Sequence, residues 1–282
     1  MYKADLIIDG ETFAFDFPSA SSKSIYISTI EGLTGTSASL DTVSNAVGIG
    51  EAVTGGMITS KNITIRGYML DNVVATKREL LAFAYPLAKG KLIIYDRDIQ
   101  REFFPYREIN VVVKESPRFT QEKHSKFSLL LYAPVPAFKN STVATVQVKP
   151  TGQGDWIDYS GDFSADYDLT VTPSANGVQS LVVEYWNSSY SRQKKLYLDF
   201  SKYRAGGLNF GEVFRLYRKD GILYAEVEAN GSTTDALMCI DLVNSNFWSI
   251  DKGAGFIANW GITGDVVIKY QEAYSGVVVS GV

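Results

Sequence analysis

The sequence predicts a mainly β protein with two domains and a single α-helix. Short runs of β-branched and aromatic residues recur along the chain between Gly, Ser, Asn and Asp, a pattern typical of antiparallel sheets. One segment alone follows the helical period. The length of 282 residues exceeds that of one typical domain of about 100 to 200 residues, so two separate cores are expected.

The first domain, residues 1–139, is expected to be a β-sandwich or barrel with one flanking helix. The helix is predicted at about 77–89, because Thr76 and Glu79 match a capping box and Gly90 supplies a C-terminal stop. Pro86 should kink or shorten its last turn. Strands are predicted at 4–8, 24–29, 62–69, 91–95, 101–106, 109–114 and 126–132.

The segment 33–59 is rich in Gly, Ser, Thr and Ala and shows no strand pattern. Loops longer than about 12 to 15 residues are uncommon in compact domains and are often functional. This one is more apolar than a solvated linker. We therefore predict that this segment, called the arm below, pairs with or lies against a neighbouring subunit, with the apolar residues Leu33, Val43, Val47, Ile49, Val53, Met57 and Ile58 in the interface.

The second domain, residues 140–282, is expected to be another β-sandwich, a jelly roll. The boundary is placed near residues 134–142, which hold two prolines and a polar turn. The Asp220-Gly221 step predicts a tight hairpin between two of the strands. Strands are predicted at 145–149, 167–172, 179–186, 195–200, 213–217, 222–228, 237–242 and 266–270.

Composition argues against several classes of function. A single cysteine, Cys239, and a single histidine, His124, cannot form a disulfide framework or a multi-ligand zinc site within one chain. Cys239 is expected in the core and His124 in a solvated loop. We expect no catalytic, cofactor-binding or metal-binding residue and thus no enzyme. No secretory signal or membrane span is predicted.

Charge argues against nucleic-acid recognition. The net charge is -4, and residues 1–140 hold 16 Lys and Arg against 15 Asp and Glu. Without a basic excess, tight binding to a phosphate backbone has no visible source, so no sequence-specific nucleic-acid partner is expected.

Two patterns leave weaker alternatives open. Gly253, Gly255 and Ala258 match a dinucleotide fingerprint only loosely, and the strand-like surroundings favour coincidence. An acidic series is interpreted as solvated loop acids, with a loose cation site as the alternative. It consists of Asp155, Asp158, Asp162, Asp166 and Asp168.

All four tryptophans lie in the second half of the chain. Aromatic rings fill sandwich cores and oligomer contacts, and this interpretation is favoured. The alternative is a surface that stacks on sugar rings or contacts a partner protein. The candidate contact residues are Trp156, Trp186, Trp248 and Trp260.

The order of features in residues 1–140 resembles the N-terminal domain of siphophage distal tail proteins, the Dit family. The matching stretches are NITIRGYM (62–69), KRELLAFAYPLAKGKLIIYDRD (77–98), FFPYREINVVVKESPRF (103–119) and FSLLLYAPVPAFK (127–139). The ending ITGDVVIKYQEAY (262–274) resembles the closing strand of the second domain in that family. The resemblance covers about half of the chain and follows the order of elements.

This resemblance implies a tail-tube-like first domain, a galectin-like or carbohydrate-module-like second domain and a hexameric ring at the distal end of the virion tail. The ring would join the tail tube protein to the tail-tip hub, and DNA would pass through its central channel. The implied partners are further copies of the chain, these tail proteins, and a receptor-binding protein or host surface glycan. Assembly would take place in the cytoplasm of the bacterial host. A carbohydrate-binding module or adhesin is the competing function.

Overall fold

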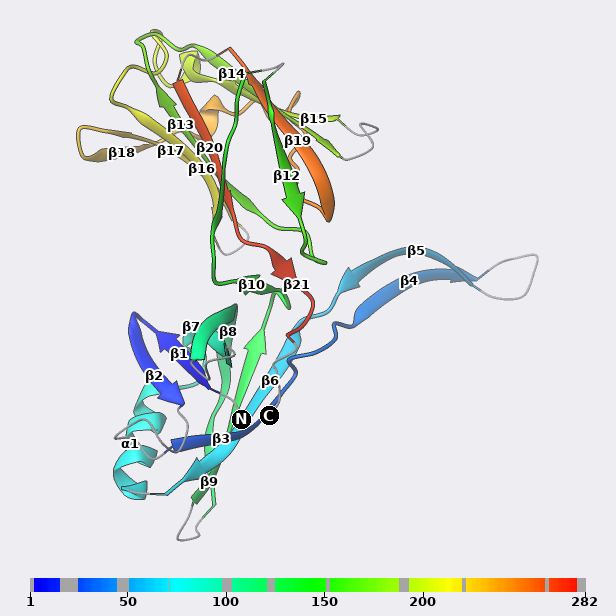
Figure 1. Ribbon diagram of the computed structural model, residues 1–282, viewed down its shortest axis with the longest axis vertical. Helices are drawn as coiled ribbons and strands as arrows, with labels where there is room; N and C mark the ends of the chain where they lie inside the picture. The colour runs from blue at the N-terminus through cyan, green and yellow to red at the C-terminus, as the bar shows by residue number, and fades with distance from the viewer. Residues whose placement is uncertain are drawn as a thin grey trace. The chain divides into compact units, whose positions relative to one another are not determined.

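Figure 1 shows the computed structural model of the chain. It describes residues 3–15, 25–44, 51–70, 72–97, 103–120, 125–150, 153–187, 193–219, 222–261 and 264–277. Only the backbone is described for residues 40–44, 51–57, 97, 103–104 and 187. The fold is mainly β, with antiparallel sheets and one α-helix, α1, among these residues. The fold class predicted from the sequence is thus confirmed.

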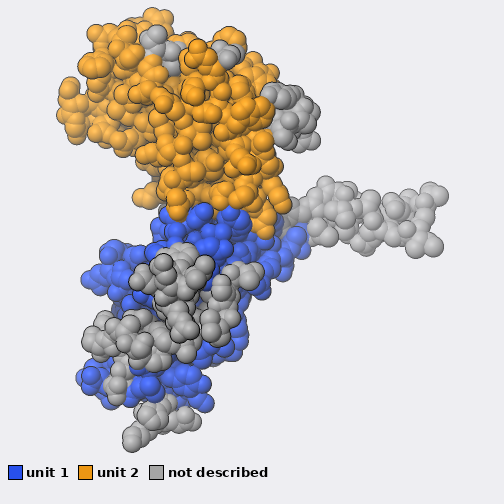
Figure 2. Space-filling model, viewed as in Figure 1, with its two compact units in different colours: residues 1–141, 274–282 blue, residues 142–273 orange. Residues whose placement is uncertain are grey.

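The chain forms two compact units (Figure 2). Unit 1 consists of Met1–Ser141 and Tyr274–Val282, and unit 2 of Thr142–Ala273. The sequence prediction placed the boundary at 139/140 and the whole C-terminal part in the second domain. In the structure the chain instead passes between the units twice, because the segment from Tyr274 onward returns to unit 1.

Unit 1 is built on one large antiparallel sheet with the strand order β2-β1-β7-β8-β9-β6-β3. This path has two ends, β2 and β3, so the described residues form an open sheet and the barrel alternative is excluded. The short strands β10 and β21 pair with each other, and β10 also pairs with β8. The bounds are β1 Ala4–Ile8, β2 Glu11–Phe15, β3 Ile25–Glu31, β6 Lys61–Met69, β7 Lys89–Arg97, β8 Phe103–Phe119, β9 Ser125–Ala133, β10 Phe138–Asn140 and β21 Ala273–Tyr274.

The large sheet curls around its own core. Phe15 on β2 stacks on Phe127 on β9 with ring centroids 5.7 Å apart, although three strands separate β2 from β9 in the sheet. Phe13 packs against Phe83 of α1 at 5.5 Å. Buried and more exposed residues alternate along β6, because successive side chains of a strand point to opposite faces.

The helix α1 spans Val73–Phe83, so the predicted range of about 77–89 is wrong at both ends. Thr76 is not a cap: it is buried, and its amide donates to the carbonyl of Asn72 inside the first turn. The helix ends three residues before Pro86, because the residue preceding a proline avoids the helical conformation. The remaining residues form a turn that leads into β7.

The strands predicted at 101–106 and 109–114 are one 17-residue strand, β8. Its pairing with β7 shifts register between Ile94 and Tyr95, where Tyr95 lies opposite Pro105. A proline cannot donate to the ladder and is tolerated at such irregularities. Arg107 and Glu108, which separated the two predicted strands, pair with Ile94 and Ile93, so the strand is continuous there and its bulge lies one residue earlier, at Tyr106.

Unit 2 has two antiparallel sheets, as a β-sandwich requires. The six-stranded sheet has the order β11-β20-β13-β16-β17-β18, and the four-stranded sheet has the order β12-β19-β14-β15. The bounds are β11 Ala144–Gln147, β12 Asp155–Tyr159, β13 Tyr167–Pro173, β14 Ser180–Asn187, β15 Gln193–Asp199, β16 Val213–Lys219, β17 Ile222–Ala229, β18 Ser232–Asp235, β19 Gly253–Trp260 and β20 Gly264–Tyr270.

Two predictions about the strands of unit 2 have different outcomes. The hairpin predicted around Asp220-Gly221 is confirmed, because Lys219 of β16 pairs with Ile222 of β17. The strand predicted at 237–242 is wrong: this segment begins with the 3-10 helix η2, Leu237–Cys239. The carboxylate of Asp235 accepts a hydrogen bond from the Leu237 amide and so favours a turn over an extended chain.

The returning C-terminal segment is held on unit 1 by specific contacts. The Arg107 guanidinium lies between the rings of Tyr106 and Tyr274, 4.0 and 4.1 Å from their centroids. Lys61 donates to the carbonyl of Ser275 at 2.9 Å. These contacts explain why unit 1 is made of two separate stretches of sequence.

Candidate assembly and binding surfaces

The predicted arm is a two-stranded ribbon. Its strands are β4 (Ala38–Ser44) and β5 (Glu51–Ile58), which in the described topology pair only with each other. Figure 1 shows the ribbon leading away from the large sheet of unit 1. The Thr59 amide and hydroxyl both donate to the carbonyl of Ser37, at 2.8 and 2.9 Å, and close its base.

The residues assigned to the arm have different places in the structure. Leu33 belongs to the core of unit 1, where its carbonyl accepts a hydrogen bond from the amide of the buried Val277 at 2.8 Å. Ile58 is half exposed at the end of β5. Val43, Val53 and Met57 lie on the two strands with only their backbone described, and Val47 and Ile49 lie outside the described residues.

A second exposed apolar surface of unit 1 follows the helix. Val74 and Leu81 are seven residues apart, which places them on the same face of α1, and both are exposed. Tyr85, just beyond the helix, is also exposed, and its hydroxyl donates to Asp9 at 3.2 Å. We call Val74, Leu81 and Tyr85 the α1 stripe.

Three of the four tryptophans lie on the outer face of the four-stranded sheet of unit 2. Trp156 of β12 and Trp186 of β14 are both in register with Phe256 of β19, so the three side chains form a row across the sheet. Trp156 and Trp186 each lie 5.5 Å from the Phe256 ring, centroid to centroid. Trp260, four residues beyond Phe256, is on the same face by alternation and is 50% exposed.

Trp248 has a different role. It is 5% exposed and stacks between Tyr167 and Tyr185, with ring centroids 5.1 and 6.1 Å away. It therefore packs in the core of unit 2 and is not available for contact with a ligand. The sequence did not single out Phe256, although the period-2 pattern Ala254, Phe256, Ala258 could have placed it on a strand face.

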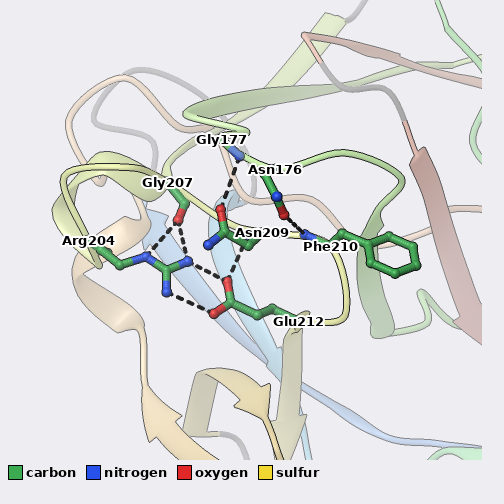
Figure 3. Close-up of polar contacts among 7 residues, drawn as sticks. All are labelled: Asn176, Gly177, Arg204, Gly207, Asn209, Phe210 and Glu212. Atoms are coloured by element: carbon green, nitrogen blue, oxygen red, sulfur yellow. Dashed lines mark hydrogen bonds and ion pairs between the residues drawn. The ribbon is translucent and has the colours of Figure 1, made fainter.

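At the end of unit 2, two loops hold an exposed aromatic side chain (Figure 3). Phe210 is 72% exposed, and its amide donates to the side chain of Asn176 at 2.9 Å. The neighbouring Asn209 accepts a hydrogen bond from the Gly177 amide at 3.2 Å. These two bonds tie the loop before β16 to the loop before β14.

The buried carboxylate of Glu212 holds this loop in place through hydrogen bonds. Glu212 accepts two hydrogen bonds from the Arg204 guanidinium, at 3.0 and 2.7 Å, and one from the Asn209 amide at 2.8 Å. Arg204 also donates to the carbonyl of Gly207. Hydrogen bonding to Glu212 raises the pKa of the Arg204 guanidinium, so the guanidinium stays charged.

Those of the residues weighed for chemistry that the structure describes do not gather into one site. Cys239 is buried, and burial raises the pKa of its thiol to about 11, which leaves it protonated and unreactive near neutral pH. His124 lies outside the described residues. Gly253, Gly255 and Ala258 lie on β19, where Gly255 leaves room for the Tyr185 ring, so they do not form a phosphate loop.

The acidic series is spread over unit 2. Asp155 and Asp158 lie on β12 and Asp168 lies on β13, so the expectation that all five are loop residues is wrong. Asp155 is 3.6 Å from Lys149, and Asp166 is 3.6 Å from Arg218. In the part of the chain that the structure describes, no three His, Cys, Asp or Glu side chains lie close enough together to hold a metal ion. None of the described helices is long and apolar enough to cross a membrane.

Comparison with known proteins places this fold among those of phage tail-tip proteins. No family model and no curated protein sequence matches the chain. The solved Dit protein of SPP1, a paradigm of the hub adsorption apparatus in phages that infect Gram-positive bacteria, shares the fold with a TM-score of 0.68 and 12% identity over 96% of this chain and 98% of its own.

The phage P2 baseplate in its activated conformation also contains this fold. Its structures with Ca and with Sr match with TM-scores of 0.54 and 0.53 at 8% identity, over 98% of this chain and 100% of theirs. The matches extend over nearly the full length of the chains compared, so they include both units. The fold that the sequence resemblance implied is confirmed.

Proposed function

We propose that the chain is a siphophage distal tail protein, a structural component of the virion and not an enzyme. In this proposal six copies form a ring at the distal end of the tail, which joins the tail tube protein to the tail-tip hub and leaves a central channel for DNA. The ring is assembled in the cytoplasm of the bacterial host. The observation that carries the proposal is the likeness of fold to SPP1 Dit over 96% of the chain.

The β4–β5 ribbon supports assembly. A two-stranded ribbon that leaves its own sheet gains little stability by itself, because isolated hairpins are only marginally stable in water. Contact with another subunit would bury part of its surface and stabilise it. A closed ring of identical subunits requires two different, complementary surfaces on each copy. The ribbon is our candidate for one surface, and the α1 stripe is our candidate for the other.

The competing function, a stand-alone carbohydrate-binding module or adhesin, accounts for less of the chain. It explains the aromatic residues of unit 2 but gives no reason for unit 1, for the ribbon, or for a fold shared with phage tail proteins over both units. Sugar contact is therefore a property to be added to the tail role. It does not replace that role.

The mass of the purified chain in solution tests the proposal. Light scattering should give six times the monomer mass of 31.1 kDa, and negative-stain microscopy should show an annulus. Ring closure can need a template, so the measurement is repeated with the tail tube protein. A monomer at high micromolar concentration, with and without that protein, contradicts the proposal.

A further inference from the structure

We propose that the outer face of the four-stranded sheet in unit 2 binds a neutral glycan on the aromatic row Trp156–Phe256–Trp186. The three rings come from three adjacent strands and lie in register. Trp156 is 50% exposed, and the other two rings are partly exposed. The C–H face of a sugar ring is apolar, so it packs on aromatic side chains of this kind.

The spacing of the row fits a chain of sugars. Successive centroids are 5.5 Å apart on both sides of Phe256, which is close to the length of one sugar ring in a linear glycan. The Phe256 ring is inclined by 69° to the Trp156 ring and by 55° to the Trp186 ring, so the row is not one flat platform but offers a separately tilted aromatic contact to each of two or three consecutive sugars. Gly154 supports this arrangement, because a Cβ atom at that position would collide with the Phe256 ring.

Polar side chains border the aromatic row, where they can form hydrogen bonds with the hydroxyl groups of a bound sugar. Gln193 of β15 is the cross-strand partner of Trp186 and extends the row by one strand. Asp158 is on the same face as Trp156, two residues along β12. Both are exposed. Aromatic walls with a few polar groups are typical of small-molecule and sugar sites.

Charge on this face favours a neutral glycan over an anionic polymer. Among the described residues, Lys195 lies beside the row and is paired with Glu184 at 2.5 Å, so its charge is already compensated. Asp158 adds a negative charge. On the described part of this face, a polymer of sugar phosphates would meet the carboxylate of Asp158 and an ammonium group that Glu184 already neutralises.

The size of the row favours a glycan over a protein. A stable protein interface buries roughly 800 Å² on each partner, with about 20 to 30 residues a side. Three rings bordered by Gln193, Asp158 and the Glu184–Lys195 pair provide only a small part of such an area. The same three rings are sufficient to cover a few sugars.

The test is a titration of the full chain with neutral hexasaccharides of glucose, galactose and N-acetylglucosamine, followed by tryptophan fluorescence and calorimetry. We expect at least one of them to bind, and Trp156→Ala and Trp186→Ala to lower that affinity about tenfold or more. Trp156→Tyr, which keeps a ring, should retain most of the affinity. Phe210→Ala, which removes an exposed aromatic elsewhere in unit 2, is the matched control and should change nothing.

The proposal is overturned by any of three results. The first is no binding to the neutral panel. The second is binding to poly(glycerol phosphate) alone with strong salt dependence. The third is a loss of affinity shared equally by Phe210→Ala. Urea unfolding of each variant shows whether the fold is kept. Light scattering on the same samples reports the ring independently, so failure of glycan binding and failure of ring assembly are distinguishable.

Discussion

Arg204 and Glu212 determine how the end of unit 2 is organised. Glu212 is 8% exposed and accepts three hydrogen bonds, two of them from the guanidinium and one from the Asn209 amide. Asn209 in turn holds Gly177, and the next residue, Phe210, is held by Asn176. One buried carboxylate thus fixes two loops and orients an exposed aromatic side chain.

Replacing Glu212 by glutamine should therefore destabilise unit 2. The variant keeps the shape of the side chain but loses the charge that strengthens its hydrogen bonds to Arg204. We expect the free energy of unfolding of unit 2 to fall by about 1 to 2 kcal/mol. All four tryptophans lie in unit 2, so urea unfolding followed by tryptophan fluorescence reports this unit alone.

The matched control is Glu228→Gln. Glu228 pairs with Arg215 at 2.9 Å on the neighbouring strand, but both side chains are about half exposed, so the change should cost less than about 0.5 kcal/mol. If the free energy of unfolding falls equally in the two variants, burial does not make the Glu212 ion pair more stabilising than the exposed one.

At the residue scale, the sequence identified the right kind of side chain for the aromatic row but not its arrangement. It named four tryptophans, of which two belong to the row, Trp260 shares its face, and Trp248 is in the core. Which face of a strand is buried depends on the second sheet of the sandwich, and a single strand pattern does not reveal this partner. Phe256 was missed for the same reason.

At the element scale, two missed strands carried a readable signal. Asp9 and Gly10 have positive φ angles between β1 and β2, and Asn230 and Gly231 have them between β17 and β18. Asp-Gly and Asn-Gly are the dipeptides that favour such two-residue hairpin turns. Applying the rule used at Asp220-Gly221 to these positions would have predicted β2 and β18. The Gly-rich strands β5 and β19 have weak strand propensity, and their pairing partners stabilise them.

Also at the element scale, the ribbon can be removed without cutting the core. The Ser37 carbonyl and the Thr59 amide are 2.8 Å apart, so a two-residue Asn-Gly turn can replace residues 38–58. We expect this variant to keep its circular dichroism spectrum, because β4 and β5 do not pair with the large sheet. Light scattering should show that the ring is lost and a monomer remains.

Leu33→Ala is the contrasting variant for the ribbon. Leu33 was assigned to the arm but lies in the core of unit 1, so this change should destabilise the unit by about 2 to 5 kcal/mol and leave the ring intact under native conditions. If the ribbon variant remains a ring, the subunit interface lies elsewhere. If it unfolds, the ribbon contributes to the fold of unit 1.

At the scale of the whole molecule, charge is divided unequally between the units. Unit 1 holds 16 Lys and Arg against 15 Asp and Glu, a net charge of +1, and unit 2 holds 11 against 16, a net charge of -5, so the negative net charge of -4 comes from unit 2. In the proposed ring, unit 1 surrounds the channel. A nearly neutral wall neither attracts a polyanion strongly nor repels it, and DNA can slide along it.

This charge balance predicts weak DNA binding by the ring. Each phosphate that a protein neutralises adds about -0.9 to the slope of log affinity against log salt, so a channel with few such contacts should give a slope shallower than about -5. Fluorescence anisotropy of labelled double-stranded DNA at several salt concentrations measures this slope. The ribbon-replacement variant is the matched control, because a monomer has the same composition outside residues 38–58 but no channel. A slope of about -5 or steeper for the ring and a shallow one for the monomer would mean that the lumen concentrates basic side chains, and the low-friction channel would then be ruled out.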